Sequence, residues 1–381
     1  MTGTGERILI TGATGFLGRE VVKHLLHHRP GARLILLVRG ANRDATERRG
    51  ARVLAHAYGG DASGEDADRL EILRADITAD RCGLDARDHD AAVAGTTHVI
   101  HAAAAVSFDQ TLDPARRINV EGTRHVLALA DAAGRQGHLQ SFSYVSTAFV
   151  AGCRTGVVRE DELDVGQAFR NSYEKTKCEA ETLVRQHADR LPVLVLRPSI
   201  VVGSSETGST SSFKMIYWPL RVYATRRWRT VPGHPDTVID LIPVDFVARA
   251  IAHLAFEDRA IGRTMHLCAG PEGDATSGEI AQAAARFFQL PPPRFVNPLL
   301  YRALIRPIAL LALSRKSARV LREGQVYRPY FHMRLRFDTA TARQLLDPAG
   351  LPAPRVLDYL ERVFRYCRDS DWGRRPVAQK V

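Results

Sequence analysis

A tyrosine and a lysine four residues apart are the side chains of this sequence best suited to acid–base chemistry. Tyr173 and Lys177 lie in residues 171–181, whose composition is helical, so both would occupy one helix face. A phenol has a pKa near 10, too high for efficient proton transfer at neutral pH, and a nearby ammonium lowers it. Thr147, at the end of a predicted strand, would hold a substrate oxygen near the phenol. The three residues therefore suit hydride addition to a carbonyl, although Tyr-x-x-x-Lys pairs also occur by chance on solvated helices.

Residues 11–18, Thr-Gly-Ala-Thr-Gly-Phe-Leu-Gly, match a dinucleotide-binding turn that would bring the hydride donor. They follow the apolar run 8–10 and precede an amphipathic helical pattern. The first glycine permits the turn, the second lets the backbone approach a pyrophosphate, and the third lets the helix pack. The N–H groups and dipole at the helix start favour the diphosphate charge. A turn that needs glycine only for backbone reasons is the alternative. The candidate contacts are Gly12, Thr14, Gly15, Phe16, Leu17 and Gly18.

An arginine ends the second predicted strand, at residues 33–40, where an NAD site would carry an acid. An Asp or Glu there would bind the ribose 2′-hydroxyl of NAD. Arg39 would instead bind a 2′-phosphate and stack on adenine, which favours NADPH over NADH. Arg43, Arg48 and Arg49 follow closely, and Arg48 is our candidate for a second contact. Solvated arginines in a basic loop would have the same pattern.

Further candidate cofactor contacts lie at the ends of later strands. A carboxylate after the strand near residues 70–76 would accept from the adenine amino group or cap a turn. Small residues after the strand near 97–101 would let the backbone pass close to the cofactor, as would an ordinary packing seam. Residues 119–123 are expected to open a helix whose asparagine ties strand ends together. The strand at 191–203 would lie beside the nicotinamide or close the sheet. These candidates are Asp76, Ile77, Ala102, Ala103, Ala104, Asn119, Pro198, Ser199 and Ile200.

Length, charge and cysteine content restrict the class of protein. The 381 residues are enough for a large core and one or two lobes. The five cysteines are scattered without metal-ligand spacing, so we expect free thiols in a reducing compartment and no metal site. The net charge of +11 suggests anionic partners, and without a nucleic-acid motif we do not expect nucleic acid. We see no signal peptide and no apolar run of the ~20 residues that span a bilayer, which favours the cytoplasm.

Taken together, these segments resemble the extended short-chain dehydrogenase/reductases over roughly residues 7–250. Within that superfamily they are most similar to the branch of fatty acyl-CoA reductases (male-sterility type) and the thioester-reductase domains of carboxylic acid reductases and peptide synthetases. The matching segments are TGATGFLG at 11–18, LLVRG at 36–40, DIT at 76–78, HAAA at 101–104, NVEGT at 119–123, YVSTAFV at 144–150, Tyr173 to Lys177, RPSIVVG at 197–203 and DLIPVDFV at 240–247.

The resemblance implies an α/β fold, a Rossmann-type doubly wound parallel sheet with a smaller, mostly helical C-terminal substrate lobe. We expect the NADP-binding domain at 1–203 plus about 236–270, and a discontinuous substrate lobe at about 204–235 plus 271–381. The implied catalytic triad is Thr147, Tyr173 and Lys177.

The resemblance also implies a reaction, in which NADPH reduces an acyl thioester to an aldehyde or onward to an alcohol. The acyl group would arrive on CoA or on an acyl carrier protein. One alternative keeps the same residues and reduces a lipophilic ketone, or oxidises a secondary alcohol, of sterol or polyketide type. A second alternative is a non-catalytic NADP-binding sensor.

The last third of the chain carries the least recognisable pattern. We expect helices at 277–288, 298–322 and 354–366, and a mobile substrate loop at 204–216. The apolar stretch 298–316, interrupted by basic residues, would be either an interfacial helix at a membrane surface or an ordinary helix lining the substrate lobe. Phe331 and Phe337 would close the pocket or pack the lobe. The oligomeric state has no signal in the sequence.

Overall fold

A fully parallel, seven-stranded sheet forms the centre of the computed structural model, which describes residues 5–60, 68–226, 230–301, 303, 324–375 and 377. Its strands are β1 (Arg7–Thr11), β2 (Arg33–Val38), β3 (Leu70–Arg74), β4 (His98–His101), β5 (Ser141–Val145), β7 (Val193–Pro198) and β12 (Thr264–Leu267). Their order across the sheet is β3-β2-β1-β4-β5-β7-β12, and every neighbouring pair is parallel. The order reverses between β1 and β4, where such sheets bind ligands at the carboxyl ends of their strands. The predicted Rossmann-type doubly wound fold is confirmed.

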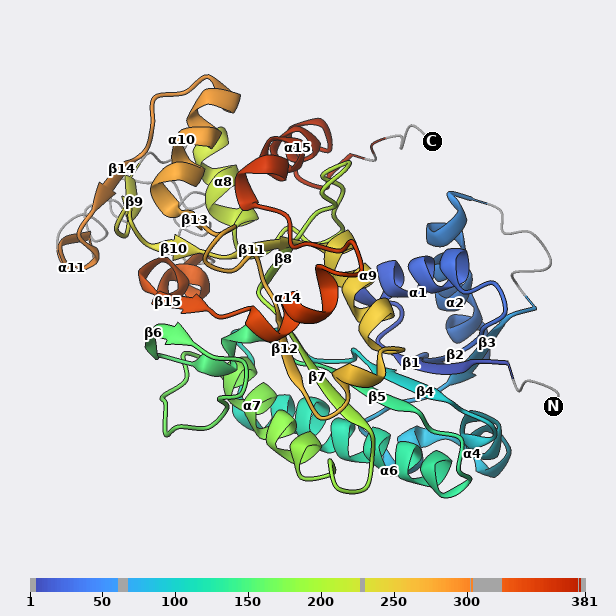
Figure 1. Cartoon of the computed structure of the whole chain (residues 1–381). Helices are drawn as coiled ribbons and strands as arrows, with labels where there is room; N and C mark the ends of the chain where they lie inside the picture. Colours follow the sequence, from blue (N-terminus) through green and yellow to red (C-terminus); the bar gives the residue numbers. More distant parts are fainter. Residues whose placement is uncertain are drawn as a thin grey trace.

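Helices cover both faces of this sheet (Figure 1). Each face has its own hydrophobic core. One face is covered by α1 (Phe16–His28), α2 (Arg43–Tyr58) and α9 (Val244–Leu254), and the other by α4 (Ala86–Val93), α6 (Gly122–Arg135) and α7 (Ser172–Arg185). Alternate residues of a strand serve alternate faces, so Ile8 and Ile10 pack under α1 whereas Leu9 packs toward α6. Burial on both faces explains why the strands are apolar throughout.

The helix that carries Asn119 begins earlier than we predicted. Residues 119–123 do not open it, because α5 (Leu112–Arg116) runs into a π-helical turn, η2 (Arg117–Glu121), and then into α6. Pro114 falls in the first turn of this run, where a missing N–H and a fixed φ are tolerated. The π turn places Asn119 on the side of the sheet's carboxyl edge, and such single π turns are frequent at functional sites.

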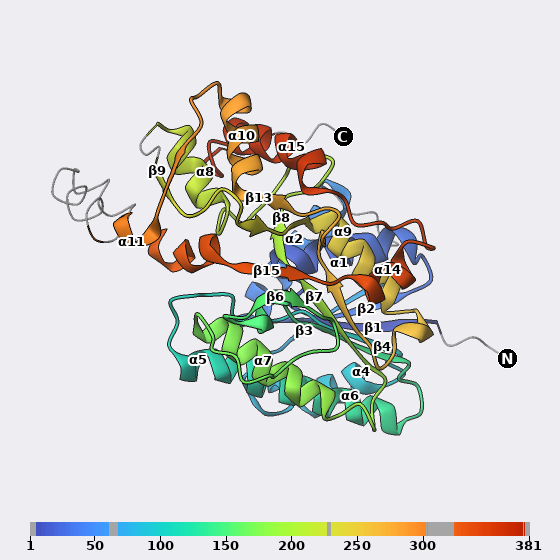
Figure 2. The same ribbon diagram turned by 60° about the vertical axis from the view of Figure 1, so that its left-hand side comes forward.

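A second hydrophobic core lies beside the sheet, around the helices α8 (Tyr217–Ala224), α10 (Ser277–Phe288) and α15 (Val356–Asp369) (Figure 2). Short strand pairs connect it to the sheet: β8 (Ile200–Val202) with β11 (Leu241–Pro243), and β6 (Thr155–Val158) with β15 (Arg334–Phe337). The remaining elements are η1 (Asp80–Gly83), η3 (Ala148–Ala151), β9 (Thr230–Pro232), β10 (Val238–Ile239), η4 (Asp258–Ala260), β13 (Ala275–Thr276), β14 (Arg294–Val296), α11 (Pro298–Leu300), η6 (Gly324–His332) and α14 (Ala340–Leu346). This core also takes in Ile200 and Leu241, which we had assigned to the dinucleotide domain, so the domain boundaries stay a prediction.

Of the three helices predicted near the C-terminus, two are present and most of the third lies outside the described residues. The helix at 277–288 is α10, and the helix at 354–366 is α15, which ends three residues later. Of the helix expected at 298–322, the structure describes α11 and little more; most of that helix, and with it the membrane contact proposed for 298–316, lies outside the described residues. Within the described ranges, no helix is long and apolar enough to cross a membrane.

Candidate active site

The glycine loop between β1 and α1 folds tightly against the segment that leaves β4. Gly12 has φ of +75°, and a Cβ there would lie 2.6 Å from the backbone of Ala102 and Ala103. A Cβ on Gly18 would overlap the carbonyl group of Gly12, so both positions require glycine. Helix α1 begins without a side-chain cap and without an acid in its first turn. Its first N–H groups therefore suit the diphosphate of a dinucleotide.

Arg49, rather than Arg48, is the second arginine that the structure brings to the glycine loop. Arg49 Nη2 donates to Thr14 Oγ1 at 2.9 Å, and Nη1 donates to the carbonyl oxygen of Arg39 at 2.7 Å. Arg39 is exposed after β2, and Arg48 is exposed on α2. Arg49 at Thr14 and the exposed Arg39 beside it form a positive edge of the glycine loop.

Asp76 closes a turn after β3. Its Oδ1 accepts hydrogen bonds from Thr78 N at 2.9 Å and Thr78 Oγ1 at 2.8 Å. Burial acts to raise the pKa of Asp76, but these bonds and the charge of Arg39 lower it below its ordinary value. The structure thus shows the turn-capping alternative, beside Arg39. Ile77 packs its side chain against Gly122, where a Cβ would lie 2.7 Å from Ile77 Cδ1.

Asn119 fixes the small-residue segment after β4, which includes Ala104, to the helix that carries the predicted triad. Its Oδ1 accepts from Ala105 N at 2.8 Å, and its Nδ2 donates to Thr176 Oγ1 at 2.9 Å. Asn119 is 2% exposed. It therefore ties the end of β4 to α7, close to the role that we predicted between strand ends.

Strand β5 and helix α7 bring Thr147 and Tyr173 together. Thr147 follows β5, accepts a hydrogen bond from Phe149 N at 3.3 Å and donates one to Pro198 O at 3.4 Å. Burial raises the pKa of Tyr173 to about 12, against a hydrogen bond with Thr147 that lowers it. We expected Lys177 to lower the pKa of Tyr173, and this lowering does not occur. Tyr173 therefore holds its proton at neutral pH, as a proton donor must.

The ammonium of Lys177 points into the sheet, which is why it does not lower the pKa of Tyr173. Its Nζ donates to the Tyr144 hydroxyl and to the Val145 carbonyl oxygen, each at 2.8 Å. Burial lowers the pKa of Lys177 to about 7. The sequence analysis assigned no role to Tyr144. The one signal for it was strand alternation, which puts Tyr144 with Phe142 on the face covered by α7.

Pro198, Ser199 and Ile200 are all buried at the junction of β7 and β8. Ser199 Oγ donates to Asp240 Oδ1 at 2.5 Å, so this hydroxyl is occupied within the protein. Asp240 also accepts from Ala269 N at 3.0 Å, and burial raises its pKa to about 6 despite these bonds. The segment therefore presents backbone and apolar atoms to its surroundings, and its carbonyl at Pro198 meets Thr147.

The ring of Phe108 lies between Tyr173 and two further tyrosine rings. The ring of Phe108 lies 5.7 Å from that of Tyr173, 6.0 Å from Tyr327 and 5.4 Å from Tyr330. Phe337 is buried against Phe149, with ring centres 5.9 Å apart, which supports lobe packing for Phe337. The side chain of Phe331 lies outside the described residues.

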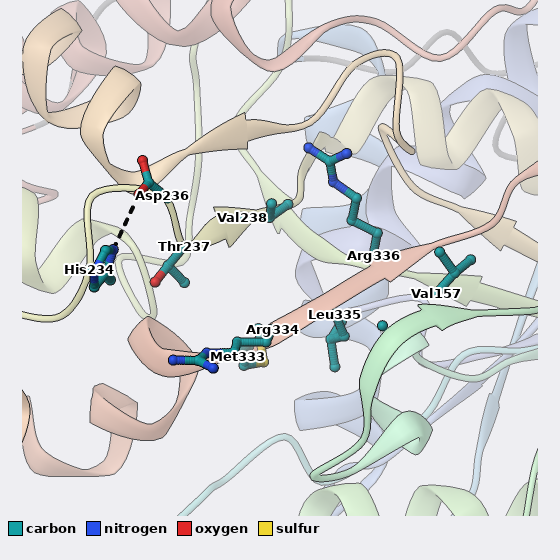
Figure 3. A pocket seen from close by; sticks show the side chains of 10 residues that line it. Val157, His234, Asp236, Thr237, Val238, Met333, Arg334, Leu335 and Arg336 are labelled. Carbon is teal, nitrogen blue, oxygen red and sulfur yellow. Dashed lines mark ion pairs between the residues drawn. The ribbon is translucent and has the colours of Figure 1, made fainter.

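A pocket of about 440 Å³ opens between β6, β15 and the loop before β10 (Figure 3). It is lined by Gly156, Val157, His234, Asp236, Thr237, Val238, Met333, Arg334, Leu335 and Arg336. His234 and Asp236 form an ion pair of 3.3 Å on one side of it, and Arg336 pairs with Asp274 at 3.1 Å. Since none of the predicted site residues lines this pocket, it is separate from the triad.

Comparison with known proteins places the sequence among reductases. A family profile for NAD-binding domains, described as "Male sterility protein", matches residues 10–251. A nonribosomal peptide synthetase of Cladobotryum sp, FrzA, is 27% identical over 390 residues, covering 94% of this chain and 36% of that protein. Fatty acyl-CoA reductase 1 of Pongo abelii is 27% identical over 277 residues, covering 64% of this chain and 53% of that protein. The chain thus spans only about a third to a half of these relatives.

Among solved structures, the terminal R domain from the myxalamid PKS-NRPS biosynthetic pathway is similar over nearly the whole chain. The TM-score is 0.82 at 25% sequence identity, and the match covers 99% of this chain and 94% of that domain. The similarity therefore includes the second core as well as the dinucleotide-binding sheet.

Proposed function

Because this chain belongs to the male sterility protein family of NAD-binding domains, we propose that it reduces acyl thioesters and prefers NADPH as the cofactor. The observation that carries the proposal is the meeting of Thr147 and Tyr173 at the carboxyl edge of the sheet, one helical turn from Lys177. The tight glycine loop and the uncapped start of α1 suit the cofactor's diphosphate. The arginine pair at Thr14 suits its 2′-phosphate.

In this reaction the bound cofactor supplies the hydride that adds to the thioester carbonyl carbon. Thr147 and Tyr173 donate hydrogen bonds to the carbonyl oxygen as negative charge develops there. Tyr173 then gives its proton to that oxygen. The third N–H of the Lys177 ammonium, which neither Tyr144 nor Val145 accepts, would hold the nicotinamide ribose. The resulting hemithioacetal breaks its C–S bond, so that the oxygen's proton moves to the sulfur and an aldehyde and a thiol leave. A second hydride would convert the aldehyde into an alcohol.

The thiol that leaves would be that of a pantetheine arm, on CoA or on a carrier protein. Relatives of both kinds support this, because a peptide synthetase and a fatty acyl-CoA reductase match the chain about equally in identity. The net charge of +11 suits the phosphates of CoA and an acidic carrier surface alike. The ring of Phe108 beside Tyr173 suits an apolar acyl chain.

The test is NADPH oxidation measured together with free thiol, using a panel of acyl-CoAs and the same acyl groups on a carrier protein. Thiol release that matches oxidation supports thioester reduction, and one or two NADPH per thiol distinguishes aldehyde from alcohol. The two arms of the panel separate CoA from the carrier protein. Turnover of ketones without thiol release would overturn the proposal in favour of a ketone reductase.

A matched variant separates catalysis from cofactor sensing. Tyr173→Phe keeps the ring but removes the proton donor, so turnover should fall by about 10²- to 10⁴-fold while NADPH binding persists. Cofactor binding is measured by NADPH fluorescence. If neither the parent nor the variant turns over any thioester or ketone, and both bind NADPH, the enzymatic proposal fails and the sensor alternative stands.

A further inference from the structure

Both hydrogen bonds that hold the Lys177 ammonium come from β5, and one of them is made by a side chain. The Tyr144 hydroxyl and the Val145 carbonyl each accept from Nζ at 2.8 Å. Lys177 is 2% exposed and Tyr144 is fully buried. Because burial removes the water that would solvate an ammonium, each protein acceptor replaces part of that solvation. The hydroxyl of Tyr144 is therefore placed to control both the position and the charge of Lys177.

Tyr144 also lies beside a buried series of hydrogen bonds that reaches the strand before the glycine loop. Its hydroxyl interacts with Thr123, and Thr123 Oγ1 lies 3.0 Å from His101 Nε2. His101 Nδ1 lies 2.6 Å from Thr11 Oγ1. Thr123 gives its own proton to Asn119 O, so it accepts from His101 Nε2–H, and Nδ1 then accepts from Thr11. The series therefore gives the Tyr144 hydroxyl a second neighbour, Thr123, besides Lys177.

Among the described residues, Tyr144 is the side chain that accepts a hydrogen bond directly from Lys177. The charged and titratable groups nearby do not take its place. On α7, Glu181 favours the charged lysine, but its carboxylate is bound by Arg197 of β7 at 2.6 Å and by Arg185 at 2.9 Å. Burial lowers the pKa of His101, on β4, to about 3, so this imidazole is neutral. Tyr173 and Cys178, also on α7, are uncharged at neutral pH because burial raises the pKa of each to about 12.

We propose that Tyr144 is a positioning residue for the reaction, whose hydroxyl holds the side chain of Lys177 in place and keeps it as an ammonium. The consequence for turnover rests on the proposed function, whereas the consequence for Lys177 itself does not. The competing explanation is that Tyr144 only fills the core between β5 and α7, as Phe142 does. The two explanations differ in whether the oxygen atom matters.

Two tyrosine-to-phenylalanine variants test this difference. Tyr144→Phe removes one oxygen and keeps the ring. Tyr359→Phe is the matched control, because Tyr359 is 1% exposed and its hydroxyl donates to Leu241 O at 2.9 Å in the second core. Thermal unfolding is measured first, to establish that both variants are folded. Both lose a buried hydroxyl, but only one of the two hydroxyls contacts Lys177.

The first readout is the titration of Lys177, which needs no turnover. The chain has six lysines, so a sample labelled with ¹³C at lysine Cε gives a spectrum with few signals, and the Lys177→Met variant identifies the signal of Lys177. We expect the titration midpoint of Lys177 to fall by about one pH unit in Tyr144→Phe and to stay unchanged in Tyr359→Phe. A midpoint that stays or rises in Tyr144→Phe, or that falls equally in both variants, overturns the proposal.

The second readout is the pH dependence of kcat on a thioester that the parent chain reduces. Loss of the ammonium should move the alkaline limb of the profile to lower pH by the same shift. Turnover in Tyr144→Phe would then be about tenfold below the parent near pH 8 and close to it near pH 6. An equal loss at every pH would indicate a structural role and overturn the proposal. If the parent reduces no thioester, the proposed function fails, and the lysine titration still decides the role of Tyr144.

Discussion

The hydroxyl of Tyr330 donates a hydrogen bond to Glu174 Oε1 over 2.7 Å, although the two residues are 156 positions apart. Glu174 is fully buried and lies next to Tyr173 in the first turn of α7. Asn171, the N-cap residue of α7, donates to the same hydroxyl at 2.8 Å. The C-terminal segment η6 is thereby attached to the turn of helix that carries the proposed proton donor.

Tyr330→Phe should weaken this attachment measurably. The change leaves a buried carboxylate with one donor fewer, which costs about 1.5–3 kcal/mol for a hydrogen bond to a charged group. We expect that loss in the free energy of unfolding from urea titration, together with a lower kcat/KM because Tyr173 is less well fixed. A double-mutant cycle with Glu174→Gln tests the pairing. Additive effects of the two substitutions would contradict it.

A buried ion pair also supports α7, one turn beyond Lys177. Arg197 and Glu181 are both fully buried, with Nη2 and Oε1 2.6 Å apart, and Ser146 Oγ also donates to Glu181 at 2.7 Å. Removal of one partner from a buried pair leaves an uncompensated charge. Arg197→Met should therefore lower the free energy of unfolding by about 3–5 kcal/mol.

Arg185 provides the matched control, because it contacts the same carboxylate at 2.9 Å but keeps 31% of its side chain exposed. Arg185→Met should cost about 1 kcal/mol or less, since solvent screens a partly exposed pair. Urea unfolding of both variants gives the comparison. Equal costs for the two arginines would show that burial does not decide the strength of this cluster.

The sheet and the glycine loop could be predicted from the sequence because their signals are local. Apolar runs mark each strand, and glycines 12, 15 and 18 mark the turn that follows β1. Tyr173 and Lys177 share a helix face by spacing alone, and α7 confirms that helix. In these cases the residues that decide the structure are close together in the chain.

The partners of these residues could not be predicted, because each of them is distant in sequence. The contact of Arg49 with Thr14 joins residues 35 positions apart, and that of Lys177 with Tyr144 joins residues 33 apart. Helical phase decides that Arg49, and not Arg48, faces the loop, and a one-residue error in phase turns a side chain by 100°. Our prediction that Lys177 lowers the pKa of Tyr173 was wrong for the same reason, since the direction of the Lys177 ammonium depends on contacts with β5.

Burial of Lys177 has a consequence for stability that can be measured without substrate. The pKa of Lys177 is lowered from 10.5 to about 7 by burial. Between these two values the unfolded chain binds one proton more than the folded chain, so the contribution of this group to stability rises with pH. The slope approaches about 1.4 kcal/mol per pH unit.

Lys177→Met removes this titration, so the free energy of unfolding of the parent should rise relative to that of the variant as the pH rises from about 7 to about 9. Urea unfolding at three pH values within this range measures the difference. Lys23→Met, at an exposed position on α1, is the matched control, and its difference from the parent should stay flat. A flat difference for Lys177→Met as well would contradict a pKa of Lys177 lowered by burial.

The arginine pair at the glycine loop predicts which cofactor the chain prefers. Arg49 is held by Thr14 and by the carbonyl of Arg39, so its guanidinium is already ordered next to the loop. A charge-assisted hydrogen bond to a 2′-phosphate is worth about 1.5–3 kcal/mol, or about 10- to 100-fold in affinity. Arg39→Ala and Arg49→Ala should each raise the KM for NADPH by about that factor and leave the KM for NADH nearly unchanged.

The control for charge alone is Arg52→Ala, because Arg52 is exposed on the same helix, α2, as Arg49. It removes the same charge from that helix and should change neither KM by more than about twofold, since salt screens a distant exposed charge. Arg48→Ala then decides between the two neighbouring arginines: the contacts of Arg49 predict that Arg48→Ala behaves like the Arg52 control. If Arg48→Ala weakens NADPH binding as much as Arg49→Ala, the cofactor reorganises α2 on binding. If both arginines affect NADH and NADPH equally, their role is to order the loop and not to select the phosphate.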